Sequence, residues 1–163
     1  MTGLIIEGLV AGTRSLDAQT LASLAGQIPD VSALAPGKEG IAVRLASVLD
    51  EVGLSEDAGF ITIHAEGSYS ASVPLKAVKD HAILIYGLGG APLPRDKGGP
   101  IRFFIPDVAA CQTDEVDQCA NVKYVQRIVL SADPGQDTRP KTPKQHVDIH
   151  VDEKPRRLTH EGI

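Results

Sequence analysis

Short runs of β-branched and aromatic residues separated by turn residues recur along the chain, and this pattern predicts a fold built mainly from β-strands. Strict alternation of apolar and polar residues over positions 60–64 indicates a strand with one buried face, and positions 71–75 suit its hairpin partner. Further strands are expected at 4–10, 82–87 (AILIYG), 100–106 (PIRFFIP) and 122–131 (VKYVQRIVLS).

Two stretches show helical spacing instead. Over positions 45–52 the apolar residues follow the i, i+3, i+4, i+7 spacing of a helix buried on one face, and Gly53 suits the left-handed position after it. An earlier helix is expected to begin after a cap at Ser15 or Asp17 and to end at Gly26. Because strands predominate, the predicted fold class is α+β and mostly β.

The chain length of 163 residues is that of one domain, and its composition sets the character of the core. The chain is 42% hydrophobic with only 4% aromatic residues and no Trp, so Val, Ile, Leu and Ala must fill the interior. We expect residues 1–133 to form the domain. From residue 134 the sequence turns proline-rich and charged, which predicts a linker and a C-terminal arm or edge strand. That arm could dock on a protein partner or on a second copy of the chain.

A formal net charge of −5 argues against nucleic acid or an anionic membrane as the main partner, since both require a basic surface. No apolar run approaches the about 20 residues of a membrane span, and the N-terminus lacks the basic start of a signal peptide. We therefore expect a cytoplasmic protein, although the mature chain of a periplasmic or secreted protein would show the same features.

Three basic residues lie at or beside the ends of the strands between positions 82 and 131: Lys97, Arg102 and Lys123. Nearby glycines would let a ligand approach the backbone, so the arrangement suits a small anionic ligand. Arg102 is the charged residue of an otherwise apolar strand, and a buried guanidinium needs a partner. That partner is either a bound anion or an internal carboxylate such as Asp96 or Asp107.

The order of motifs in this region resembles the molybdopterin-binding domain of the sulfite oxidase family. The shared features are a buried strand, G-A-P-L-P, R-D-K, G-G-P-I-R, a strand ending in Pro, and V-K-Y-V-Q-R-I. The resemblance implies a sulfite oxidase-like fold and a molybdopterin-type cofactor whose anionic end is held by Arg102 and Lys123. Lys97 stands where the family usually has His, and would be a third contact.

The resemblance also implies a cysteine thiolate that ligates molybdenum from the segment corresponding to VSALAPGKE, residues 31–39. This segment contains no cysteine, and Ser32 offers only a hard oxygen of very high pKa. Redox activity is therefore in question, and two hypotheses stand. The protein is a molybdopterin-binding member of an oxidoreductase family, or it is a non-catalytic scaffold that serves as a small-ligand-binding or protein-interaction module.

Two further groups of residues could carry chemistry. Cys111 and Cys119 are compatible with reduced thiols, with a disulfide that closes the loop, or with a metal site completed by nearby acidic residues. In a strand, His146, Asp148 and His150 would share one face, which is either a solvated polar face or a divalent-metal site.

Overall fold

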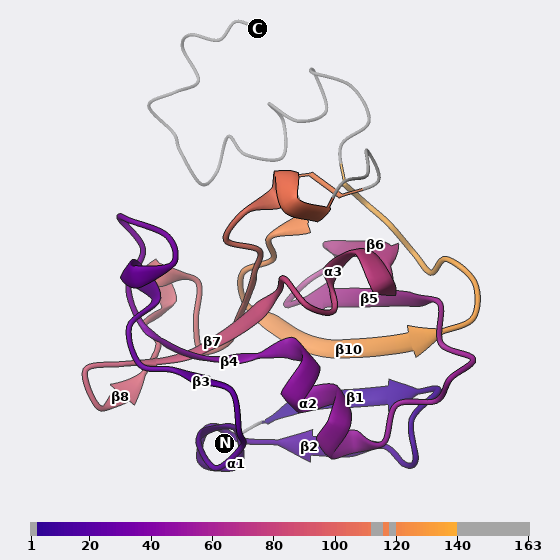
Figure 1. Ribbon diagram of the computed structural model, residues 1–163, viewed down its shortest axis with the longest axis horizontal. Coiled ribbons are helices and arrows are strands. Elements are labelled where there is room, and N and C mark those ends of the chain that lie inside the picture. Colours follow the sequence, from indigo (N-terminus) through magenta and orange to yellow (C-terminus); the bar gives the residue numbers. More distant parts are fainter. Residues whose placement is uncertain (1–2, 112–115, 118–119, 140–163) are drawn as a thin grey trace, which may run out of the picture.

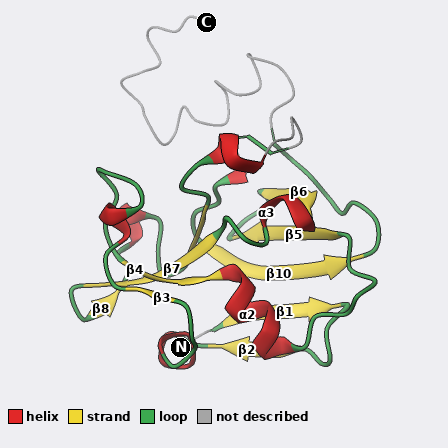
Figure 2. Ribbon diagram, viewed as in Figure 1, coloured by secondary structure: helices red, strands yellow, loops and turns green. Residues whose placement is uncertain are grey.

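The computed structural model describes residues 3–111, 116–117 and 120–139 of the chain (Figure 1). Figure 2 shows that strands predominate over helices in this part, and they form two five-stranded sheets. The predicted α+β, mostly β class is therefore confirmed. None of the helices in the described residues is long and apolar enough to cross a membrane.

The first sheet has the strand order β2-β1-β10-β5-β6. Its strands are β1 (Leu4–Gly8), β2 (Arg14–Leu16), β5 (Phe60–Ala65), β6 (Ser70–Pro74) and β10 (Val125–Ser131). β1 and β10 lie parallel in the sheet, with Ile6 opposite Ile128. Leu4 and Ile6 are fully buried whereas Ile5 is 40% exposed, so the alternation of the sequence directs one face of β1 into the core.

The second sheet has the order β3-β4-β7-β8, and β9 also pairs with β7. Its strands are β3 (Gln27–Ile28), β4 (Ile41–Arg44), β7 (Ile83–Leu88), β8 (Ala91–Pro92) and β9 (Arg102–Phe104). The runs expected as strands at 82–87 and 100–106 pair with each other, since Ile83 lies opposite Phe104.

β10 follows β9 in the chain but does not lie beside it, because the two strands belong to different sheets. The chain makes one isolated bridge between Phe103 and Val122 before it changes sheet. The change occurs at Tyr124, whose φ of 58° lies in the left-handed region. The segment before β10 therefore joins the two sheets.

The helices are short. α1 (Ala18–Ala22) begins after Asp17, whose carboxylate accepts a 2.8 Å hydrogen bond from the backbone N–H of Thr20. The alternative cap, Ser15, was wrong, because Ser15 and Leu16 pair with β1 instead. α2 (Leu45–Val52) and its left-handed C-cap Gly53, at φ 75°, confirm the second predicted helix. α3 (Leu75–Val78) follows β6 directly.

β9 lies between two hydrophobic clusters because its side chains alternate. Phe103 belongs to the larger cluster, which is built from both sheets and the helices. Phe104 belongs to the smaller one, whose buried members are Ile28, Val31, Ala35, Ala42, Ile83, Ile85, Leu93 and Phe104. Arg102 is two residues before Phe104, so the strand directs it to the same side as the smaller cluster.

Beyond β10 the chain turns back and runs beside β6 as far as the described residues extend (Figure 1). We call residues 134–139 the strap. Gly135 donates its backbone N–H to the hydroxyl of Ser72, and Thr138 donates its own to the carbonyl of Ser70, both at 2.9 Å. The strap therefore covers the edge of the first sheet. The rest of the predicted arm, with His146, Asp148 and His150, lies outside the described residues.

Candidate anion-binding site

The candidate site is built around a tight turn that joins β8 to β9. Residues Arg95–Lys97 form a 3-10 helix, η2, which ends at Gly98 with φ 95°. Gly98 donates its N–H to the carbonyl of Arg95, and its own carbonyl accepts a 2.8 Å hydrogen bond from the N–H of Tyr124. The turn is thus fastened to the start of β10.

Gly98 brings Arg102 and Lys123 together. A Cβ atom added at Gly98 would lie 2.8 Å from Cγ of Lys123 and 3.0 Å from Cδ of Arg102. Both side chains therefore pass directly over the glycine, although they come from segments that lead into different sheets. We call Lys97, Arg102 and Lys123, grouped around Gly98, the basic cradle.

Arg102 is half-buried and directed toward η2. Its Nη1 donates to the carbonyl of Lys97 at 3.4 Å, and its guanidinium carbon lies 5.2 Å from the centre of the Phe104 ring. The carboxylate of Asp107, one of the two considered as partners, accepts a 3.1 Å hydrogen bond from the backbone N–H of Ala109. These contacts hold the guanidinium of Arg102 between the carbonyl of Lys97 and the ring of Phe104.

Lys97, the third predicted contact, forms an ion pair. Its Nζ lies 3.0 Å from Oε1 of Glu39, and the hydrogen bond and the charge of Glu39 raise the pKa of Lys97. Lys38, the residue before Glu39, places its Nζ 5.8 Å from the centre of the Phe104 ring. Lys38 and Glu39 were not among the predicted site residues, because attention to their segment was limited to whether it contains a cysteine.

The segment in which the resemblance implies a thiolate carries oxygen groups instead. Val31–Ala33 form a short 3-10 helix, η1, capped by Asp30. The carboxylate of Asp30 accepts hydrogen bonds from the N–H of Ser32 at 3.0 Å and from its hydroxyl at 2.6 Å, and these bonds lower the pKa of Asp30. Ser32 is thus engaged with a carboxylate, which makes it a poor metal ligand.

A cavity of about 330 Å³ opens on the other side of the Lys123–Tyr124 segment. Its lining residues are Gly3, Ile5, Glu66, Arg95, Pro100, Ile101, Tyr124, Val125 and Gln126. Arg95 forms a 2.5 Å ion pair with Glu66, and its guanidinium carbon lies 4.7 Å from the centre of the Tyr124 ring. Neither Arg102 nor Lys123 lines this cavity, so it is separate from the basic cradle.

Cys111 is a buried, free cysteine, and its burial raises the pKa of the thiol. The other cysteine considered with it, Cys119, lies outside the described residues, as do the acidic residues Asp114 and Glu115. Among the side chains that the structure describes, no three His, Cys, Asp or Glu residues are grouped as a metal site would require.

Comparisons with known proteins agree with the geometry. Residues 40–138 match the family described as the oxidoreductase molybdopterin binding domain. The uncharacterized oxidoreductase YuiH of Bacillus subtilis (strain 168) is 31% identical over 65 residues, which are 39% of this chain and 33% of that protein. This chain therefore matches about a third of the length of that relative.

A solved structure supports the fold alone. The sulfane dehydrogenase SoxCD from Paracoccus pantotrophus matches with a TM-score of 0.62 at 18% sequence identity. The match covers 81% of this chain and 38% of the SoxCD chain. The similarity of fold and the family match thus indicate the same kind of domain.

Proposed function

Because the chain belongs to the oxidoreductase molybdopterin-binding domain family, we propose that it binds a molybdopterin-type cofactor. In this proposal Arg102 and Lys123 hold the anionic end of the cofactor, and Lys97 adds a third positive charge. The observation that carries the proposal is the position of Arg102 and Lys123 side by side over Gly98.

The residues of the cradle fit an anionic group. A guanidinium presents a planar set of N–H donors that matches phosphate, and an ammonium is a compact charge on a flexible stem. Gly98 has no side chain, and any Cβ there would meet both Arg102 and Lys123. Two cations held side by side in this way suit a phosphate or a similar anion.

The residues do not fit a molybdenum centre of the kind the resemblance implies. A bound metal would supply the redox centre, but the segment at residues 31–39 provides no thiolate to ligate it. Cys111 does not replace that ligand, because it is buried and its raised pKa favours the protonated thiol. We therefore infer that this domain binds the cofactor or its pterin part and has weak or no redox activity.

Metal and pterin analysis tests the proposal. The full chain is expressed in a host that makes the cofactor, and the purified protein is assayed for bound pterin and molybdenum. We expect bound pterin in the natural protein and its loss in the Arg102→Ala/Lys123→Ala variant. An Arg14→Ala/Lys76→Ala variant removes the same charges at exposed positions on other elements and serves as the control. Well-folded protein without pterin would overturn the proposal.

The cavity favours a second candidate, a non-catalytic small-ligand-binding module. Its volume of about 330 Å³ is that of a small-molecule site, and charged and apolar groups converge on it. Tyr124 forms part of its lining while holding a left-handed backbone conformation that costs a bulky residue about 1–3 kcal/mol. Pterin-free protein whose Tyr124 and Gln126 NMR signals shift with small aromatic ligands would support this candidate.

A further inference from the structure

The loop at residues 36–40 lies beside the basic cradle through two independent contacts. Glu39 pairs with Lys97 at 3.0 Å, and Lys38 lies 5.8 Å from the ring of Phe104. The loop joins η1 to β4, and the family match begins only at its last residue. Its two charged residues thus add to the part of the site that the family match covers.

Glu39 occupies a position that a ligand anion would also seek. The ammonium of Lys97 is the third positive charge of the cradle, and a carboxylate already lies within hydrogen-bonding distance of it. Both side chains of this pair are about half exposed, at 45% for Lys97 and 57% for Glu39. Exposed ion pairs contribute little net free energy, so a phosphate with greater charge can displace the carboxylate.

Lys38 brings another cation to the ring of Phe104. Its Nζ and the guanidinium of Arg102 both lie within 6 Å of the centre of the Phe104 ring, at 5.8 and 5.2 Å. A long, flexible lysine side chain at this position can reach an anion that Arg102 holds.

The backbone of the loop is suited to a rearrangement around Lys38 and Glu39. Gly37 and Gly40 flank these residues with φ angles of 91° and 133°. A Cβ atom at Gly40 would lie 2.7 Å from Ile85, so this end is packed against β7, whereas a Cβ at Gly37 would meet nothing within 4 Å. One end of the loop is therefore anchored and the other is open.

We propose that Glu39 is an internal competitor for the ligand anion at Lys97, and that Lys38 is a fourth cationic contact of the same site. The ligand class is a phosphate monoester or a pyrophosphate. This inference rests on the proposed anion site. It adds that the site exchanges an internal carboxylate for the ligand, so that anion binding frees Glu39 from Lys97.

Titration with inorganic pyrophosphate at low ionic strength tests the inference, using calorimetry on the full-length natural protein and its variants. Glu39→Gln is expected to bind about twofold to fivefold more tightly, the size of effect that removal of an exposed ion pair allows. Lys38→Ala is expected to bind about twofold to fivefold more weakly.

Matched controls separate local competition from overall charge. Glu51→Gln removes the same charge from an exposed pair with Arg14, which lies in β2 of the first sheet. Lys76→Ala removes an exposed lysine from α3. Both controls are expected to bind as the natural protein does. In a Lys97→Met background, Glu39→Gln should no longer increase affinity.

The outcomes distinguish this inference from the proposed function. If pyrophosphate fails to bind, or binds equally well to Arg102→Ala/Lys123→Ala, the anion site itself is wrong. If binding depends on Arg102 and Lys123 while Glu39→Gln and Lys38→Ala behave like their controls, the anion site stands and the exchange mechanism is overturned. Affinity that rises equally in Glu39→Gln and Glu51→Gln also overturns it, because only overall charge would then matter.

Discussion

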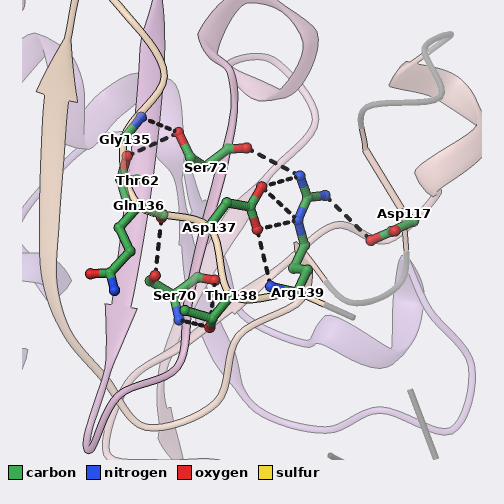
Figure 3. A network of polar contacts seen from close by, with 9 residues as sticks. All are labelled: Thr62, Ser70, Ser72, Asp117, Gly135, Gln136, Asp137, Thr138 and Arg139. Atoms are coloured by element: carbon green, nitrogen blue, oxygen red, sulfur yellow. Dashed lines mark hydrogen bonds and ion pairs between the residues drawn. The ribbon is translucent and has the colours of Figure 1, made fainter. Parts of the chain in front are cut away.

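Two arginines of this domain, Arg139 in the strap and Arg102 in the cradle, have very different surroundings. Figure 3 shows Arg139 enclosed by protein groups: it pairs with Asp137 at 2.6 Å, donates to the carbonyl of Ser72 at 3.1 Å and reaches Asp117 at 3.4 Å. Its side chain is only 9% exposed. Arg102 is half-buried, donates at 3.4 Å to the carbonyl of Lys97 and lies on the Phe104 ring.

The two arginines differ in how fully the protein itself encloses and pairs their charge. Burial alone would lower the pKa of Arg139, but the hydrogen bonds and charge of Asp137 more than offset this and raise it. Its charge is therefore compensated within the fold and fastens the strap to β6. Arg102 lies near Lys123, Lys97 and Lys38, and in our proposal this concentration of positive charge serves to bind an anion.

Replacing Arg139 is expected to cause the largest change in the free energy of unfolding, and so tests this contrast most directly. Arg139→Ala would leave the carboxylate of Asp137, which is 18% exposed, without its guanidinium. We expect a loss of about 2–4 kcal/mol in the free energy of unfolding, as for other largely buried ion pairs broken from one side. Arg102→Ala should cost less than about 1 kcal/mol. Urea unfolding monitored by circular dichroism measures both.

Equal losses in these two variants would remove the distinction between the strap and the cradle. Arg139→Lys is a useful intermediate, since it keeps the charge but not the planar guanidinium that contacts both oxygens of Asp137. It is expected to recover part of the stability.

A smaller loss of stability is expected when Gly98 is replaced. Gly98→Ala places a side chain at φ 95° and pushes on Arg102 and Lys123, so it should cost about 1–2 kcal/mol of stability and weaken pyrophosphate binding at least about fivefold. Gly90→Ala is the matched control, because Gly90 has φ 81° and its Cβ would meet nothing within 4 Å. Unfolding and calorimetric titration would show a similar loss of stability in both variants and a loss of binding in Gly98→Ala alone.

If Gly90→Ala weakened binding as much as Gly98→Ala, the close packing around Gly98 would not matter for the site. The loss of unfolding free energy is expected to be smaller at Gly98 than at Arg139. The residues of the cradle are not members of the two hydrophobic clusters, so a change among them disturbs the core less.

The smallest predicted change in stability concerns His64, which lies in β5 of the first sheet. Burial and the charge of Arg127, which lies opposite it, lower the pKa of His64, while Glu7 partly opposes this. Between the lowered folded pKa and the unfolded value of about 6.5, the unfolded chain binds more protons, so stability rises with pH. The protein should therefore be slightly less stable below pH 6, and His64→Gln should reduce that dependence in thermal melts at pH 5 and 7. An unchanged pH dependence would show that His64 has no such role.

The sequence predicted the parts of the fold that local patterns determine. α2, the β5–β6 hairpin and the pairing of β7 with β9 follow from apolar spacing and turn residues. The placement of β10 did not follow, because the choice of a partner strand depends on the whole core. Leu16 illustrates the same point: its pairing with Leu4 overrides the helical pattern into which it also fits.

The candidate site shows a similar division. Motif order brought Arg102 and Lys123 to attention, and the structure places both over Gly98, while their binding role stays a prediction. Glu39 and Lys38 were missed because a charged pair in a loop resembles any solvated surface. Arg139 was assigned to a linker, since no local pattern shows that a proline-rich segment will pack on β6.

The parallel pairing of β1 with β10 also affects how the protein is made. Among the described strands, β1 is made well before its parallel partner β10, so the first sheet stays incomplete until residues up to Ser131 have left the ribosome. During that interval Leu4 and Ile6 have no partner strand on one side, and their apolar side chains are exposed to other nascent chains. Chaperone binding to β1 would therefore be most valuable before β10 emerges from the ribosome.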